Sequence, residues 1–251
     1  MKPLLLAPVL FVLAAGRAPL VPARPAVLVE LFTSEGCSSC PPADALLARL
    51  YEAQPVAGVE VVPLELHVDY WDRLGWKDPF SSAVYSRRQE GYSKIFGPDR
   101  VYTPQMVVDG AEELVGSDAA GATAALTRAA ALPHMSVGLS ADRRGATVRI
   151  AVDAPAAPAA AAESIAVMIA IVEDGLTSAV TRGENSGRTL AHVAVVRRLE
   201  SIGALDRDTF SGEGQWTLAA AWQPSNLRVV AFLQGQKTRR VYGSTQARLV
   251  R

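Results

Sequence analysis

The sequence predicts an α/β arrangement in the first half of the chain and a β-rich, sandwich-like arrangement in the second. Before Pro133, strand-like and helix-like patterns alternate, which is typical of an α/β unit. After Pro133, short strand patterns follow one another without long helices between them, which favours an antiparallel sandwich. The predicted division is therefore a domain over residues 26–132 and a second domain over residues 135–251.

In the first half, the apolar run 26–32 predicts a strand. Apolar residues at positions 43, 46, 47, 50 and 51 have helical spacing and predict an amphipathic helix directly after it. The remaining predicted elements are a strand over 59–68, a helix over 81–95, a strand over 105–109 ending in an Asp109-Gly110 turn, and a capped helix over 117–131.

In the second half, residues 136–153 have the pattern of two strands around a glycine-containing hairpin. Further strands are predicted at 164–172, 189–197, 216–222 and 227–234. The Ala- and Pro-rich run 154–162 is predicted to be a loop, although alanine by itself favours helix.

The N-terminus has the pattern of a secretory signal peptide. Lys2 precedes an apolar run from Leu4 to Ala15, which ends in small residues around Arg17. The run is too short to span a membrane, which takes about 17 to 25 residues. We expect residues 1–18 to be a signal peptide and the mature protein to be periplasmic or secreted, without a membrane span.

The charge balance argues against several classes of partner. Lys and Arg together number 25, as do Asp and Glu, so the formal net charge is zero. Such a chain offers no electrostatic attraction to nucleic acid or to an anionic membrane surface. The sequence also lacks a phosphate-binding loop, a dinucleotide fingerprint and a Ser/His/Asp order, so we expect no cofactor.

The chain has only two cysteines, Cys37 and Cys40, which form a Cys-x-x-Cys pair between the first predicted strand and the first predicted helix. In that context the pair indicates redox chemistry. A disulfide closing so short a loop would stabilise the protein by about 2 kcal/mol, against about 4.7 kcal/mol for a 100-residue loop. The cysteines are therefore placed where a structural cross-link contributes least. Metal binding and a non-catalytic disulfide stay open as alternatives.

The order strand, Cys-x-x-Cys, helix, strand, insertion, X-Pro, strand, helix resembles the thioredoxin-like superfamily over about residues 26–132. The stretch VYTPQMVVDG resembles the segment in which that superfamily has a proline, usually cis, beside the dithiol. More narrowly, FTSEGCSSCPPAD with HVDYWDRLGWKDPF is similar to a family of exported bacterial proteins with a thioredoxin-like domain of unknown function.

This resemblance implies that Cys37 is the nucleophile and Cys40 the resolving thiol. It also implies that Thr103 and Pro104 offer backbone groups to an extended substrate. Pro41 and Pro42 depart from the superfamily pattern, because a proline at position 41 favours a helix that begins there and leaves Cys37 outside its first turn. The walls of a substrate groove are predicted at Trp71 and Trp76, although filling of the core explains these two residues equally well.

The predicted function is that of a thiol-disulfide oxidoreductase acting on protein or small-molecule thiols and disulfides, with a redox partner protein. One alternative is a copper-binding chaperone in which the thiolates act with His67 and Met106, since soft ligands select Cu(I). The other is a non-catalytic thioredoxin-like binding module. His67 with Asp69 and Asp72 is interpreted as a surface hydrogen-bonded group rather than a metal site. No role is assigned to His134 or His192.

Overall fold

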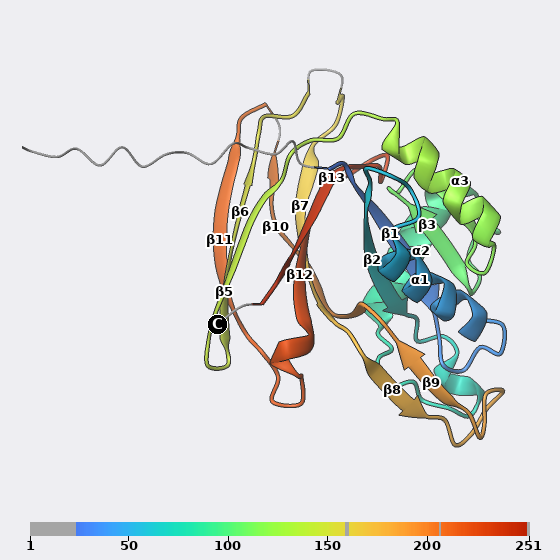
Figure 1. The fold of residues 1–251 in the computed structure, drawn as a ribbon. Coiled ribbons are helices and arrows are strands. Elements are labelled where there is room, and N and C mark those ends of the chain that lie inside the picture. Colours follow the sequence, from blue (N-terminus) through green and yellow to red (C-terminus); the bar gives the residue numbers. More distant parts are fainter. Residues whose placement is uncertain (1–23, 159–160, 206, 250–251) are drawn as a thin grey trace, which may run out of the picture.

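The computed structural model describes residues 24–158, 161–205 and 207–249 (Figure 1). The predicted signal peptide over residues 1–18 lies outside these ranges. None of the helices in the described ranges is long and apolar enough to cross a membrane.

Within the described residues the chain forms three α-helices and thirteen strands. The helices are α1 (Pro41–Ala53), α2 (Ala83–Phe96) and α3 (Ala119–Ala130). The strands are β1 (Ala26–Thr33), β2 (Glu60–His67), β3 (Gln105–Val108), β4 (Glu112–Val115), β5 (Gly138–Arg144), β6 (Thr147–Ala154), β7 (Ile165–Glu173), β8 (Leu176–Ala179), β9 (Thr189–His192), β10 (Val195–Leu205), β11 (Phe210–Thr217), β12 (Leu227–Gly235) and β13 (Val241–Arg248).

Most strands belong to one mixed sheet of eight, in the order β13-β12-β7-β10-β2-β1-β3-β4. β1 and β2 run parallel, as do β10 and β2, and the other neighbours run antiparallel. β11, β6 and β5 form a separate three-stranded sheet, and β8 and β9 form a two-stranded hairpin.

The predicted fold class, a thioredoxin-like α/β domain followed by a β-rich domain, is wrong. The four strands between residues 26 and 115 do not form a sheet of their own, because β2 pairs with β10 through Val195 and Glu65. Through β10 they continue into β7, β12 and β13. The result is a mostly β structure built on a large mixed sheet. Sequence patterns within single segments did not reveal that β2 pairs with β1 on one side and with β10, from the second half of the chain, on the other.

Several local predictions are confirmed. α1 begins at Pro41 and covers the predicted amphipathic segment, and β1, β2 and β3 lie where strands were predicted. Asp118 caps α3, as predicted, whereas the cap of α2 at Ser82 was not predicted. In the first half, β4 was not predicted. In the second half, β11 begins and ends earlier than predicted, and β8 and β13 were not predicted.

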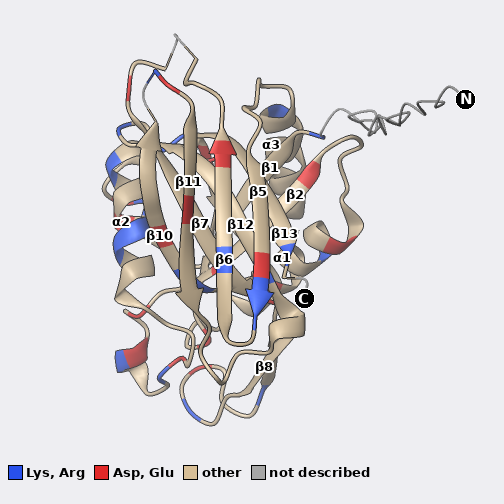
Figure 2. Ribbon diagram, turned by 90° about the vertical axis from the view of Figure 1, so that its left-hand side faces the viewer, with Lys and Arg blue, Asp and Glu red and all other residues tan. Residues whose placement is uncertain are grey.

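Three apolar clusters of the described residues hold the layers together. Helices α1 and α3 cover one face of β1, burying Leu47 and Leu126 against Val29. The three-stranded sheet packs on β7 and β12, burying Ile150 and Trp216. Its outer face is exposed and carries charged side chains such as Arg149 (Figure 2).

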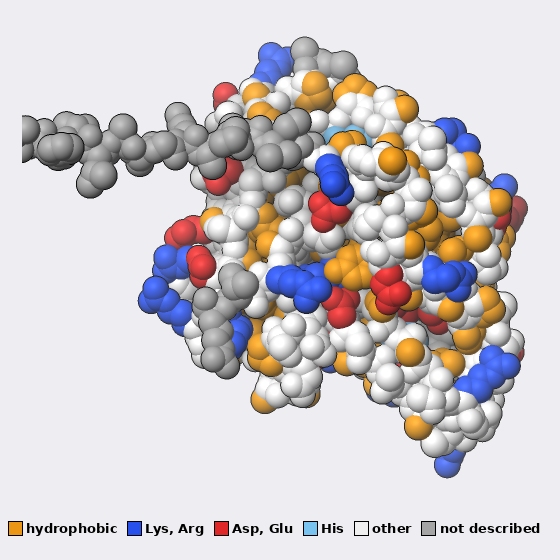
Figure 3. Space-filling model, viewed as in Figure 1, with side chains coloured by type: hydrophobic (Ala, Val, Ile, Leu, Met, Phe, Trp, Pro, Cys, Tyr) orange, Lys and Arg blue, Asp and Glu red, His pale blue; other side chains and the backbone are white. Residues whose placement is uncertain are grey.

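The remaining cluster joins the two halves of the chain. Leu28 and Leu64 from the first half share it with Val172 and Phe232 from the second, and α2 packs onto it through Tyr92. The large sheet curls so that β13 lies against β1, where Ser244 Oγ donates to the carbonyl of Ala26 at 2.8 Å. The division into residues 26–132 and 135–251 stays a prediction. On the face seen in Figure 3, charges of both signs are scattered among apolar side chains.

Candidate functional site

The two cysteines form a disulfide in the loop between β1 and α1. Cys40 is the N-cap of α1, with Pro41 in its first turn, so Cys37 lies outside the helix. The Sγ atom of Cys37 lies 3.3 Å from Ser39 Oγ and 3.9 Å from the carbonyl oxygen of Thr103. Both cysteines are fully buried, whereas Ser38 and Ser39 between them are exposed.

The structure brings the other residues predicted for the site to this loop. The Thr103–Pro104 peptide bond is cis, and Pro104 precedes β3, which pairs with β1. Trp71 Nε1 donates to Thr103 Oγ1 at 2.8 Å, and Trp76 Nε1 donates to Glu35 Oε2 at 2.7 Å. Both tryptophans are partly buried. Trp76 therefore supports the loop directly and Trp71 supports the neighbouring Thr103. Their predicted role in substrate binding stays a prediction.

A loop from the second half of the chain holds the disulfide loop in place. Asn185 lies between β8 and β9, and its Nδ2 donates to the carbonyls of Glu35 and Cys37, both at 2.9 Å. Glu184 Oε2 accepts a hydrogen bond from the backbone N–H of Ser38 at 3.0 Å. Hydrogen bonds from residues about 150 positions away therefore hold the cysteine loop in place, and Asn185, which makes two of them, is completely buried.

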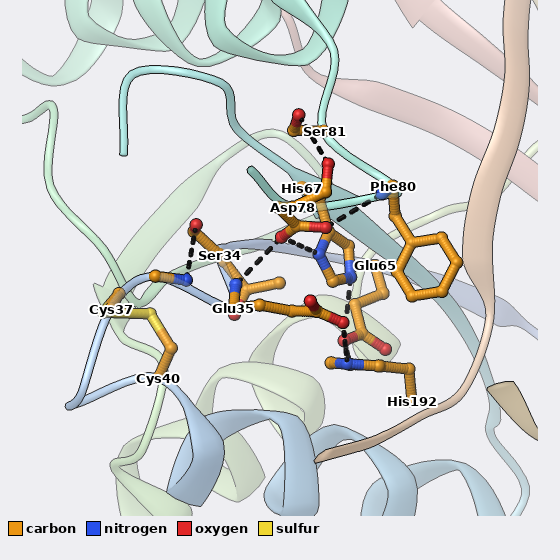
Figure 4. A network of polar contacts seen from close by, with 12 residues as sticks. Ser34, Glu35, Cys37, Cys40, Glu65, His67, Asp78, Phe80, Ser81 and His192 are labelled. Carbon is orange, nitrogen blue, oxygen red and sulfur yellow. Dashed lines mark hydrogen bonds and ion pairs between the residues drawn. A yellow bond between two sulfur atoms is a disulfide. The ribbon is translucent and has the colours of Figure 1, made fainter. Parts of the chain in front are cut away.

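Beside the loop lies a buried cluster of acids and histidines (Figure 4). Nδ1 of His67 lies 2.7 Å from Asp78 Oδ2, and its Nε2 lies 3.3 Å from Glu65 Oε1. His192, at the end of β9, places Nδ1 2.7 Å from Glu65 Oε1 and Nε2 3.2 Å from Glu35 Oε1. All five side chains are at most 2% exposed.

Opposite charges in the cluster shift its pKa values. Burial alone would raise the pKa of Glu65, but the nearby His192 and His67 lower it to about 2. Burial would likewise lower the pKa of both histidines. The charge of Asp78 instead raises the pKa of His67 well above its usual range, and the charge of Glu65 raises that of His192 to about 9. The surrounding carboxylates therefore favour the protonated form of both imidazoles.

A further buried acid lies in the first turn of α1. Asp44 accepts a hydrogen bond from Thr33 Oγ1 at 2.7 Å and is 4% exposed. Burial, reinforced by the charge of Glu65, raises its pKa to about 7. Asp44 therefore changes charge near neutral pH, one helical turn after Cys40.

The comparison with known families gives one match, to a family described as a protein of unknown function, DUF1223, over residues 28–234. The chain belongs to the DUF1223 family. The match spans the disulfide loop, the acid–histidine cluster and the Glu184–Asn185 loop. No curated protein matches the sequence.

Two solved structures resemble this family member along most of its length. A protein of Agrobacterium tumefaciens is 26% identical, with a TM-score of 0.65, covering 88% of this chain and 92% of that one. HBP35 of Porphyromonas gingivalis is 13% identical, with a TM-score of 0.68, covering 90% of this chain and 76% of that one, and shows a shared fold alone.

Sequence reasoning missed most of the acid–histidine cluster. His67 does not form a surface group with Asp69, because its ring is fully buried and bonded to Asp78. His192 was assigned no role, although it is central to the cluster. One signal was available, since Glu65 and His67 are two residues apart in an apolar strand and so share a face.

The copper alternative finds little support in these contacts. His67 lies with Glu65 and His192 rather than with the cysteines, and Met106 packs among aliphatic side chains such as Val29 and Leu31 under α1 and α3.

Proposed function

We propose that this protein is an exported thiol-disulfide oxidoreductase that exchanges electrons through Cys37 and Cys40. The observation that carries the proposal is the disulfide itself, which joins the only two cysteines of the chain across a separation of three residues. A cross-link of that length stabilises a fold little. It suits reversible exchange better, because the two sulfur atoms stay close after reduction.

The proposed exchange proceeds in two steps through a mixed disulfide. A substrate thiolate attacks Cys37 Sγ, the bond between Cys37 and Cys40 breaks, and Cys40 leaves as a thiolate. A second substrate thiolate then attacks the substrate sulfur of the mixed disulfide and releases Cys37. The substrate loses two electrons as its disulfide forms, the protein gains them, and the two substrate protons end on Cys37 and Cys40.

Burial of both sulfur atoms has a consequence for the rate. A thiolate must reach the sulfur along the axis of the disulfide, so access controls exchange. Ser38 and Ser39 form the exposed side of the loop, and Glu184 and Asn185 hold it shut. We therefore expect slow exchange with glutathione and faster exchange with a substrate that displaces this clamp.

Protein or small-molecule thiols and disulfides are the proposed substrates, with a redox partner protein that resets the pair. The proposed location is periplasmic or secreted, since a disulfide persists in oxidising compartments and residues 1–18 have a signal-peptide pattern.

The test is the reduction potential of the Cys37–Cys40 pair, measured by equilibration with glutathione mixtures and counting of alkylated thiols by mass spectrometry. We expect a value between about −120 and −270 mV, the range of known exchange proteins. With an oxidised substrate, Cys40→Ser should accumulate a mixed disulfide at Cys37, because the Cys37 thiolate attacks the substrate disulfide and no second thiol is present to resolve the product. Cys37→Ser is the matched control and should accumulate less, because the attacking thiol is absent.

The burial of both cysteines favours a second candidate function, that of a binding module whose disulfide is structural. A potential below about −300 mV would support that function and contradict exchange.

A further inference from the structure

Two histidines and a glutamate converge in the interior of the protein. Glu65 and His67 lie on the same face of β2, and His192 ends β9. One possible ligand atom from each lies within 4.8 Å of the other two. The separation of 3.3 Å between His67 Nε2 and Glu65 Oε1 is close to that of two ligands on one zinc ion, given bond lengths of about 2.0–2.2 Å. His192 Nδ1 lies 2.7 Å from the same oxygen, a hydrogen-bond distance, so these two atoms would have to move apart to bind the ion together.

Each imidazole is oriented by a second carboxylate. Asp78 binds Nδ1 of His67 and so leaves Nε2 facing Glu65, while Glu35 binds Nε2 of His192 and leaves Nδ1 facing Glu65. Metal-binding histidines are held in this way, with the second ring nitrogen bonded to a carboxylate, carbonyl or water.

These outer carboxylates are themselves fixed in position. Glu35 accepts a hydrogen bond from Trp76 Nε1, and Asp78 accepts hydrogen bonds from the backbone N–H groups of Glu35 and Phe80. The Phe80 ring packs against both imidazoles, with centroid distances of 5.3 Å to His67 and 5.7 Å to His192. The cluster therefore has an ordered polar outer layer and an apolar cover.

One atom in the cluster has no hydrogen-bond partner among the described residues. His67 Nε2 is completely buried, and its contact with Glu65 Oε1 at 3.3 Å is an ion pair without hydrogen-bond geometry. A cation between His67, Glu65 and His192 would satisfy this nitrogen and balance the surrounding carboxylates.

We propose that Glu65, His67 and His192 bind a divalent transition-metal ion, with Zn²⁺ the best match to two imidazoles and a carboxylate. Because the three ligands are buried, the ion is enclosed and has a structural role, joining β2 to the β8–β9 hairpin. The proposal does not depend on exchange at Cys37 and Cys40.

The test uses the full mature chain without an affinity tag, with the disulfide oxidised. The protein is refolded with a chelator, with Zn²⁺ or with Co²⁺, because a buried site fills during folding. We expect one metal ion per chain by elemental analysis, a rise in the melting temperature with Zn²⁺, and the visible absorption of tetrahedral Co²⁺.

The chain offers a matched control, because its third histidine, His134, pairs with Asp109 outside the cluster. His134→Gln should keep the metal and the rise in melting temperature, whereas His67→Gln and His192→Gln should lose both. Asp78→Asn and Glu35→Gln should weaken binding by about 10- to 100-fold, as removal of such outer partners does elsewhere.

A double Cys37→Ser, Cys40→Ser variant should bind as tightly as the wild type. Loss of binding in that variant would contradict the proposal by placing the metal on the thiolates. Absence of metal from the folded wild-type protein would also contradict the proposal, and this result does not require any variant to fold. Unchanged metal binding in folded His67→Gln and His192→Gln would contradict it as well.

Discussion

At the scale of single residues, Asp44 is a buried acid whose ionisation opposes folding. Its carboxyl group has an ordinary pKa of 3.8 and a folded-state pKa of about 7, raised by burial. A folded state that favours the neutral acid loses stability as pH rises from 3.8 to 7, by up to about 4 kcal/mol. At pH 8, where Asp44 is ionised, the wild-type protein should therefore be less stable than a variant with a neutral side chain at this position.

Asp44→Asn should raise the free energy of unfolding at pH 8 and have little effect near pH 4, since asparagine does not ionise and can still accept from Thr33. Urea unfolding at both pH values, with chelator present, measures the difference. Asp142→Asn, at an exposed position, is the control and should have no effect. An equal effect of Asp44→Asn at both pH values would contradict the raised pKa of Asp44.

Asp174 has the opposite pH dependence. Burial opposes its ionisation, but hydrogen bonds from the Arg228 guanidinium, at 2.8 Å, lower its pKa. Stability from this pair is thus present above pH 3.8 and lost as pH falls through the folded-state pKa. Arg228 is only 2% exposed, so it would be left buried without its partner charge.

Asp174→Asn should therefore lower the free energy of unfolding by about 1.5–3 kcal/mol at pH 7, with a smaller loss at pH 3. Chemical unfolding at the two pH values checks this. Glu112→Gln breaks a comparable pair with Arg128 at the surface and should cost less than about 1 kcal/mol. Similar losses of unfolding free energy in the two variants would show that the burial of Arg228 does not increase the cost of removing its partner charge.

At the scale of elements, the β3–β4 hairpin depends on a glycine. Asp109 and Gly110 both have positive φ angles, 45° and 63°, as a tight two-residue turn requires. A Cβ atom on Gly110 would lie 1.9 Å from the carbonyl oxygen of Arg239. The turn therefore needs glycine both for its backbone conformation and for its contact with the β12–β13 connection.

Gly110→Ala should lower the free energy of unfolding by about 2–4 kcal/mol, the sum of about 1 kcal/mol for positive φ and about 1–3 kcal/mol for the steric clash. Gly145→Ala is the matched control, because Gly145 has a φ of +61° and nothing within 4 Å of an added Cβ. It should lose only about 1 kcal/mol. Thermal or chemical unfolding compares the two, and equal losses would rule out the clash.

At the scale of the whole molecule, the two halves of the chain share one sheet and one apolar cluster, in which Leu64 packs with Val172 and Phe232. Because each half buries apolar surface of the other, we expect one cooperative unfolding transition. The tryptophans report on both halves, since Trp71 and Trp76 lie in the first and Trp216 and Trp222 in the second.

Two variants keep only one tryptophan pair each, with phenylalanine at the other two positions. In each variant, fluorescence of the remaining pair should give the same urea midpoint as far-UV circular dichroism of that same variant. Two separate midpoints would instead support independent domains over residues 26–132 and 135–251.

The sequence by itself determined the features that depend on neighbouring residues. The apolar spacing of α1, the cap at Asp118, the Asp109–Gly110 turn and the proximity of Cys37 to Cys40 all arise from short-range geometry. Such features can be predicted because hydrogen bonds and side-chain positions within a few residues fix them.

Only the tertiary structure decided how the large sheet is joined and what surrounds the disulfide. The pairing of β10 with β2 and the contact of His192 with Glu65 connect residues 127 to 130 positions apart. Strand edges offer the same backbone groups to any partner, so the pairing is selected by packing across the whole chain. The fold class was mispredicted, and His192 missed, for that reason.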